Sequence, residues 1–193
     1  MMRIYGEFVE PLPPSGEELS ISFFPDPTAI ASQWRSQPLS ADVLADYLSR
    51  FFTDPSGDRD LRAKRAEIQC AVSYIANELL ENAIKFHHPD SVQPISIQVR
   101  VRGDRLIFLV SNTIDRFKME RFQEFIEKAI ASDPHELYIH QVEKNAADES
   151  NNSSGLGYLT IMVDYMARIG WKFETLPNDT PLIRVTTMVQ LFL

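Results

Sequence analysis

Apolar and polar positions alternate in several short stretches of this chain, which predicts β-strands. Residues 19–24 read LSISFF, and residues 95–101 carry isoleucine or valine at every second position. This period of two is typical of strands that bury one face. Gly103-Asp104 favours a tight turn, and the apolar residues 106–110 are expected to return as a buried strand. The two later segments therefore predict an antiparallel hairpin.

A helical period dominates the stretch 61–86. Its apolar stripe on a helical wheel consists of Val72, Ile75, Leu79, Ala83 and Phe86. The sequence HHPD at 87–90 ends this helix, because proline cannot continue it. His87 and His88 are adjacent and do not share a helix face, so we expect hydrogen bonding at the helix end rather than metal binding. Shorter helices are expected at 27–35, 40–51, 115–131, 134–144 and 157–168, with Ser40 and Asp115 as candidate N-caps of the second and third.

A second hairpin is expected at the end of the sequence, where residues 171–175 and 182–193 flank the turn sequence LPNDTP. Strand pairs separated by helices indicate an α+β two-layer sandwich with a mixed, largely antiparallel sheet. Residues 1–18 are expected to form a leading segment or edge strand, and residues 19–193 a single domain. A chain of 193 residues, 44% of them hydrophobic, is long enough for one such core.

Charge and composition narrow the classes of function. The net charge of −8 argues against a binder of nucleic acid, although it leaves room for a local basic pocket. No apolar run approaches the roughly 18 residues of a membrane span, and the N-terminus lacks the pattern of a signal peptide. We therefore expect a cytoplasmic protein without membrane association. The one cysteine, Cys70, lies in an apolar helical stretch and is expected in the core.

The long helix carries a polar stripe beside its apolar one. Glu78, Asn82 and Lys85 follow one another at spacings of four and three, so their side chains can converge on one small target. A carboxylate, a carboxamide oxygen and an ammonium suit a metal-bound triphosphate. The carboxylate can act as a base, the carboxamide can bind Mg²⁺, and the ammonium offsets phosphate charge. A solvated helix face gives the same pattern, so the stripe alone leaves both interpretations open.

Two glycines stand where a polar loop meets an apolar helix. Residues 145–154 read NAADESNNSS and contain almost nothing that can be buried, which predicts a mobile, lid-like loop. Gly155 and Gly157 follow it, with Leu156 between them. Glycines at the start of a helix let backbone amides approach a phosphate closely, but a flexible loop gives the same short motif.

Together these motifs resemble those of a known superfamily. The sequence ANELLENAIKFHH at 76–88 is similar to the N-box of the GHKL ATPases and kinases, which include DNA gyrase and sensor histidine kinases. The sequence SSGLGYLTIMV at 153–163 resembles the G2 box that ends their ATP lid. Similarity is greatest to the bacterial anti-sigma-factor serine kinases, and it covers roughly residues 19–193. The resemblance implies a histidine-kinase-like ATPase fold, with helices covering one face of the sheet.

The resemblance also assigns roles to individual residues. Glu78 corresponds to the catalytic base, Asn82 to the asparagine that coordinates Mg²⁺, and Lys85 to a basic position near the phosphates. The lid glycines and the residue between them correspond to Gly155, Leu156 and Gly157. ATP and Mg²⁺ are the implied cofactors.

One motif departs from the pattern of the superfamily. Its G1 box reads Asp-x-Gly-x-Gly after the second strand of the hairpin, and this chain has VSNTID at 110–115. Asn112 stands where the aspartate that receives the adenine amino group is expected. Its carboxamide oxygen can accept the same hydrogen bond, but it brings no negative charge, and neither glycine is present.

These observations lead to two main hypotheses on function. The first is a bacterial regulator that binds Mg-ATP and phosphorylates a serine or threonine of a small antagonist-type protein. The second is a GHKL-fold module that sequesters its partner without nucleotide, which the altered G1 stretch motivates. A phosphatase or sigma-like factor as partner and a homodimer are further implications of the resemblance. A plain ATPase ranks last, because the chain has no transducer domain.

Overall fold

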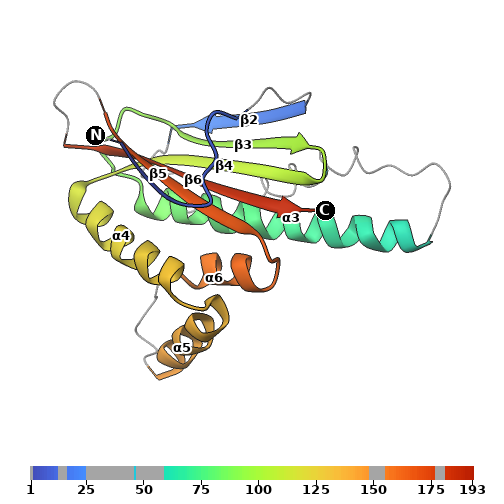
Figure 1. Cartoon of the computed structure of the whole chain (residues 1–193). Coiled ribbons are helices and arrows are strands. Elements are labelled where there is room, and N and C mark those ends of the chain that lie inside the picture. Colours follow the sequence, from blue (N-terminus) through green and yellow to red (C-terminus); the bar gives the residue numbers. More distant parts are fainter. Residues whose placement is uncertain (1, 13–16, 25–45, 47–58, 148–154, 177–180) are drawn as a thin grey trace.

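The computed structural model describes residues 2–12, 17–24, 46, 59–147, 155–176 and 181–193. The helix expected at 27–35, nearly all of the helix expected at 40–51 and most of the lid-like loop lie outside the described residues. In the part that is described, a single sheet carries a layer of helices on one face (Figure 1). The expected α+β sandwich is thus confirmed.

Six strands form the sheet in the order β1-β5-β6-β4-β3-β2. A mixed, largely antiparallel sheet was expected, and each neighbouring pair of strands in the described sheet is antiparallel. Both predicted hairpins are present, and Gly103 adopts a positive φ of 57° at the first turn. The strands are β1 (Met2–Gly6), β2 (Glu17–Phe23), β3 (Ile95–Arg102), β4 (Arg105–Ile114), β5 (Arg168–Thr175) and β6 (Ile183–Phe192).

The leading segment contributes an edge strand. Residues of β1 pair with β5, from Met2 opposite Glu174 to Gly6 opposite Gly170. Residues 2–6 therefore belong to the same sheet as the strands at the other end of the chain. β2 forms the opposite edge and starts at Glu17, two residues before the predicted strand.

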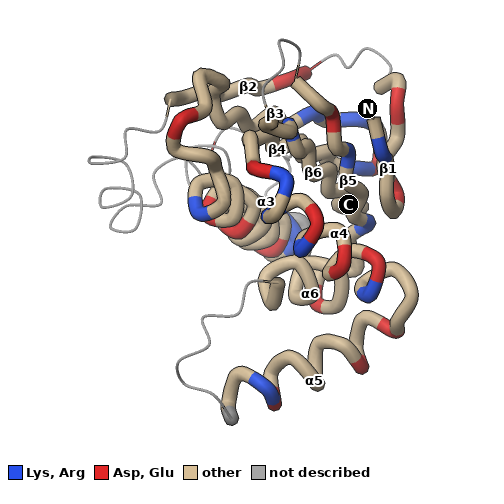
Figure 2. Tube along the Cα trace, turned by 90° about the vertical axis from the view of Figure 1, so that its left-hand side faces the viewer, with Lys and Arg blue, Asp and Glu red and all other residues tan. Residues whose placement is uncertain are grey.

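The described helices are α3 (Arg59–Phe86), α4 (Arg116–Ala131), α5 (Pro134–Ala147) and α6 (Leu156–Val163). α3 lies along the sheet, and α5 is the helix furthest from the sheet in two perpendicular views (Figure 1, Figure 2). Asp115 caps α4 as expected, since it accepts a hydrogen bond from the Lys118 N–H (2.7 Å). Asp133, just before α5, accepts one from the His135 N–H (2.9 Å). Among the described helices, none combines the length and apolar character that a bilayer-spanning segment requires.

The core lies between α3 and one face of the sheet. In α3, Val72, Ile75, Leu79 and Ala83 are buried as the apolar stripe predicts, and Phe86 is half-buried. The strand positions that alternate toward the helices are also buried, among them Ile97, Val99, Leu106, Phe108, Val110, Val185 and Val189. Burial of this apolar surface is the main term that stabilises such a two-layer fold.

Two expectations from the sequence were wrong. Cys70 is exposed, because it lies off the buried stripe of α3. The helix predicted at 157–168 ends at Val163, where the Asp164 N–H bonds to the Thr160 carbonyl (2.8 Å). Met166 then adopts a positive φ of 48°, which turns the chain into β5. Helical periodicity missed this turn, because the connecting residues are themselves partly apolar.

Candidate functional site

A cavity of about 560 Å³ lies between the helix layer and the sheet. Its volume is in the range of small-molecule binding sites. Its floor comes from β4 and β6, and its walls come from α3, α4, α5 and the residues that start α6. The polar groups of the walls and floor include Asn82, Asn112, Asp115, Lys118, Arg121, Glu124, Lys128, Gln141, Lys144 and Thr187.

Three of the residues singled out in the sequence meet at this cavity. Asn82 reaches it from α3, Asn112 from β4, and Gly155 from the residue before α6. Packing of α3 against the sheet brings these distant segments together. Gly155 has a φ of 122°, and a Cβ at this position would lie 2.7 Å from the Phe125 ring. Both facts require glycine here, since other residues rarely adopt that conformation and would collide with Phe125.

Asn112 lies deep in the cavity. It is 9% exposed, and its carboxamide forms no side-chain hydrogen bond within the described part of the chain. Buried amides are normally hydrogen-bonded, so an unpaired carboxamide that faces a cavity indicates a polar ligand group. The nearby Thr187 is engaged by a hydrogen bond with Tyr158. Burial raises the pKa of Tyr158 to about 12, although this hydrogen bond opposes the shift.

Glu78 lies beside the cavity rather than on its wall. A Cβ on Gly157 would lie 1.9 Å from the Glu78 Oε2, so the carboxylate packs directly against the first turn of α6. Burial raises the pKa of the Glu78 carboxyl above its ordinary value, and the neighbouring Glu81 carboxylate raises it further. A carboxylate whose proton affinity is raised in this way is suited to proton transfer. Gly157 therefore admits the Glu78 side chain by its lack of a Cβ.

The other two predicted site residues lie outside the cavity lining. Lys85 is exposed, and its ammonium lies 5.4 Å from the centroid of the Phe86 ring. Leu156 is half-buried, and its carbonyl accepts a hydrogen bond from the Thr160 hydroxyl (3.0 Å). The structure thus brings Asn82, Asn112 and Gly155 together, with Glu78 one helical turn before Asn82.

The basic residues of the cavity were not among the candidates predicted from the sequence. Lys118, Arg121 and Lys128 come from α4, and Lys144 comes from α5. A helical wheel places Arg121 and Lys128 on one stripe, because they are seven residues apart. The wheel could have grouped them, but it contains no signal that this stripe faces a cavity. No group of three or more histidine, cysteine, aspartate or glutamate side chains that could hold a metal ion occurs among the described residues.

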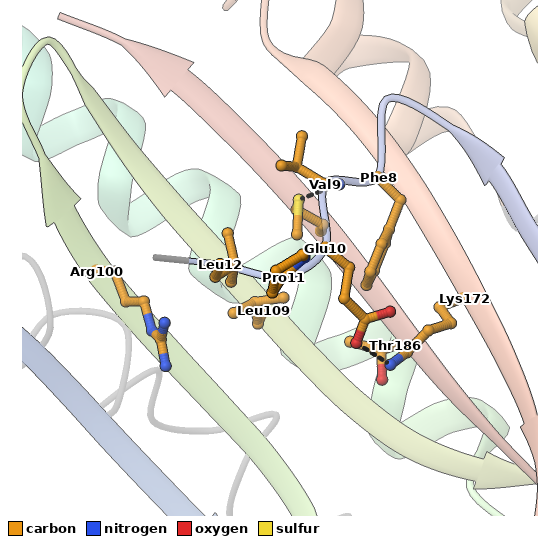
Figure 3. A pocket seen from close by; sticks show the side chains of 10 residues that line it. Phe8, Val9, Glu10, Pro11, Leu12, Arg100, Leu109, Lys172 and Thr186 are labelled. Atoms are coloured by element: carbon orange, nitrogen blue, oxygen red, sulfur yellow. Dashed lines mark hydrogen bonds and ion pairs between the residues drawn. The ribbon is translucent and has the colours of Figure 1, made fainter. Parts of the chain in front are cut away.

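A smaller cavity of about 330 Å³ lies on the opposite face of the sheet. Residues 7–12, which we name the strap, cross β5 and β6 there (Figure 3). The Glu7 N–H bonds to the Ile169 carbonyl (2.9 Å), and the Glu10 carboxylate pairs with Lys172 (2.9 Å). The Lys172 ammonium also pairs with Glu174 (3.2 Å). The ion pair between Glu10 and Lys172 in this cavity therefore helps to hold the strap on the sheet.

Comparison with known proteins relates the fold to one solved structure. No protein-family model matches the chain, and no curated protein matches it either. A chain in the crystal structure of the SiaB–SiaC complex from Pseudomonas aeruginosa matches with a TM-score of 0.57 at 13% sequence identity. The match covers 90% of this chain and 89% of that chain. At this identity the likeness is one of fold, and it extends over almost the whole of both chains.

Proposed function

We propose that this chain is a signalling regulator that binds Mg-ATP in the larger cavity and controls a partner protein through binding or phosphoryl transfer. The observation that carries the proposal is the meeting of Asn82, Asn112 and Gly155 around one cavity. The resemblance to GHKL proteins assigns these three residues to one nucleotide site, although they lie far apart in the sequence. The fold likeness to a chain of the SiaB–SiaC complex, which contains two proteins, supports a protein partner.

The residues present fit the proposed ligand. The unpaired carboxamide of Asn112 offers a donor and an acceptor to a purine edge between apolar neighbours such as Val110 and Val185. Asn82 would hold Mg²⁺ through its carboxamide oxygen, and the Gly155 backbone leaves room for a phosphate. Bound Mg-ATP would supply the phosphoryl group. The role that the resemblance assigns to Lys85 stays a prediction, since its ammonium lies outside the cavity lining.

Glu78 is the group that would accept a proton in phosphoryl transfer. It lies one turn before Asn82 on α3, and burial keeps the proton affinity of its carboxyl high. A serine or threonine hydroxyl of the partner would lose its proton to this carboxylate as its oxygen bonds to the γ-phosphorus of ATP. The bond from that phosphorus to ADP would break, and ADP would leave. The partner we propose is a small antagonist-type regulatory protein. A phosphatase or sigma-like factor and a homodimer belong to the same proposal as further partners.

A second candidate function is favoured by two observations. Asn112 lacks the charge of the expected aspartate, and the Glu78 carboxylate packs on Gly157 instead of lining the cavity. Both would suit a module that sequesters its partner without nucleotide. In such a module, partner affinity would be indifferent to ATP and to Glu78→Ala.

Titration calorimetry of the full chain with Mg-ATP separates the two functions. We expect binding that Asn82→Ala weakens by about tenfold, equivalent to about 1.4 kcal/mol, because a ligand to the Mg²⁺ is lost. Asn77→Ala is the matched control, since Asn77 lies on the same helix and bonds to Glu81 (3.3 Å) outside the cavity. No heat with millimolar Mg-ATP would exclude the nucleotide-dependent function. Equal affinity of the Asn82 and Asn77 variants would exclude the proposed metal role.

A further inference from the structure

The larger cavity has a gradient of polarity from its floor to its mouth. The floor residues Val110 and Val185 and the wall residue Leu79 are buried, and the polar Asn112 lies beside them. At the mouth, Arg121, Lys128 and Lys144 are exposed side chains that still line the cavity. A ligand that matches this gradient has a neutral, mostly flat ring at one end and an anionic tail at the other.

The charge around the cavity is opposite in sign to that of the whole chain. The lining contains four basic side chains and two acidic ones, whereas the protein as a whole carries a net charge of −8. Asp115 is largely neutralised by Lys118, whose ammonium lies 4.0 Å from its carboxylate and also bonds to the Phe86 carbonyl (3.3 Å). The second acidic residue, Glu124, lies between Arg121 and Lys128 on α4. The lining therefore keeps an excess of positive charge, which attracts anions.

The three remaining cations are available to a ligand. Within the described part of the chain, no ion pair joins Arg121, Lys128 or Lys144 to a carboxylate. The Arg121 guanidinium lies 5.8 Å from the centroid of the Phe117 ring at the same mouth. Lys128 and Lys144 stand in the last turns of their helices, where a cation also stabilises the helix dipole. That stabilising role does not require either side chain to line a cavity.

We propose that Arg121, Lys128 and Lys144, which we name the cationic rim, bind the polyphosphate tail of the ligand. The inference rests on the proposed function and deepens it, because it makes the site selective for triphosphates over monophosphates and nucleosides. It also assigns phosphate binding to cations of α4 and α5, whereas the resemblance assigns it to Lys85 of α3. These two helices then contact the ligand through its anionic tail, while α3 and the sheet contact its ring.

The rim is tested on the full chain by calorimetry with ATP, ADP, AMP and adenosine, and with inorganic tripolyphosphate as a probe of the anion site. For the wild type we expect affinity to rise from adenosine to ATP and to fall with added salt. In Arg121→Ala/Lys128→Ala/Lys144→Ala, we expect ATP affinity to fall by about tenfold or more, equivalent to about 1.4 kcal/mol. Adenosine affinity should change less than about twofold, because the floor is untouched.

A charge-matched control removes three cations that lie outside the cavity. Arg62→Ala/Lys64→Ala/Arg102→Ala replaces exposed residues of α3 and β3 and lowers the net charge by the same amount. If the wild type binds ATP and the rim variant binds it as tightly as this control, the phosphate-binding role of the rim is refuted. The proposed function then stands. If the wild type binds neither any nucleotide nor tripolyphosphate, both the rim and the proposed function are refuted. Tripolyphosphate binding that only the rim variant loses supports the anion site even where ATP does not bind.

Discussion

The contact between Gly157 and Glu78 predicts an unusual stability effect. An alanine Cβ at residue 157 would lie 1.9 Å from the Glu78 Oε2 and 2.8 Å from its Cδ. Real Cβ contacts essentially never fall below 3.0 Å, so the carboxylate must move by about 1 Å. The colliding atoms are the far end of a flexible side chain, which can rotate away. The substitution should therefore be tolerated by the fold but should displace Glu78.

The magnitude follows from two opposing effects. Overpacking costs about 1–3 kcal/mol, and the flexible carboxylate places this case near the lower end. Alanine in a helix gains up to about 0.5–1 kcal/mol over glycine, because glycine loses more backbone entropy on folding. Gly157→Ala should therefore lower the free energy of unfolding by up to about 1.5 kcal/mol in the wild type. In a Glu78→Ala background the clash is absent, and the same substitution should stabilise by about 0.5 kcal/mol or more.

A double-mutant cycle measured by urea denaturation tests this reasoning. The four proteins are the wild type, Gly157→Ala, Glu78→Ala and the double variant, and their unfolding midpoints and m-values give four free energies. We expect a coupling energy of about 1–2 kcal/mol and a change of sign between the two backgrounds. Additive effects, to within about 0.5 kcal/mol, would refute the direct contact between Gly157 and the Glu78 carboxylate.

Two further predictions concern the strap and the end of α3. A Cβ at Gly170 would lie 2.2 Å from the backbone nitrogen of Phe8, so Gly170→Ala should release the strap. Bonds such as that from the Gln190 amide to the Glu7 carbonyl would be lost. We expect the free energy of unfolding, measured by urea denaturation, to fall by about 2–4 kcal/mol. Gly103→Ala is the control, because open space surrounds Gly103 and only its positive φ makes the substitution cost about 1 kcal/mol. Equal losses of unfolding free energy in the two variants would argue against the strap contact. Burial lowers the pKa of His87, and its Nδ1 accepts a hydrogen bond from the Thr113 N–H (3.3 Å). In the unfolded chain the His87 imidazole takes up a proton near its ordinary pKa of 6.5, whereas in the folded chain it does so only at lower pH. The free energy of unfolding should therefore fall as the pH drops below 6.5. His87→Gln should make that decline shallower, and an unchanged pH profile would contradict the assignment.

Local signals in the sequence were sufficient for most of the described elements and for several of their ends. The period of two at 95–101 and the helical stripe of 61–86 predicted β3 and α3, because the side-chain direction of each element repeats with a fixed period. Asp115 predicted the start of α4, because a capping carboxylate bonds to amides only two or three residues away. Such interactions lie within one turn of the chain, so the sequence contains all that decides them.

Contacts between distant segments decided the rest. β1 joins β5 across most of the chain, and the exposure of Cys70 depends on which side of α3 the sheet covers. The polar stripe illustrates the limit for the site. Its residues share a helix face, yet Asn82 lines the cavity, Glu78 packs on Gly157 and Lys85 faces solvent.

For this protein, the sequence by itself determined the helix or strand on which each of the candidates Glu78, Asn82 and Asn112 stands. Only the tertiary structure decided which of them face one another. A helical wheel fixes the angle of a side chain about its own axis, but the partner across a cavity depends on how α4, α5 and the sheet pack around α3. The cationic rim exists for that reason, because its members become neighbours of Asn112 only when apolar burial closes the helix layer on the sheet.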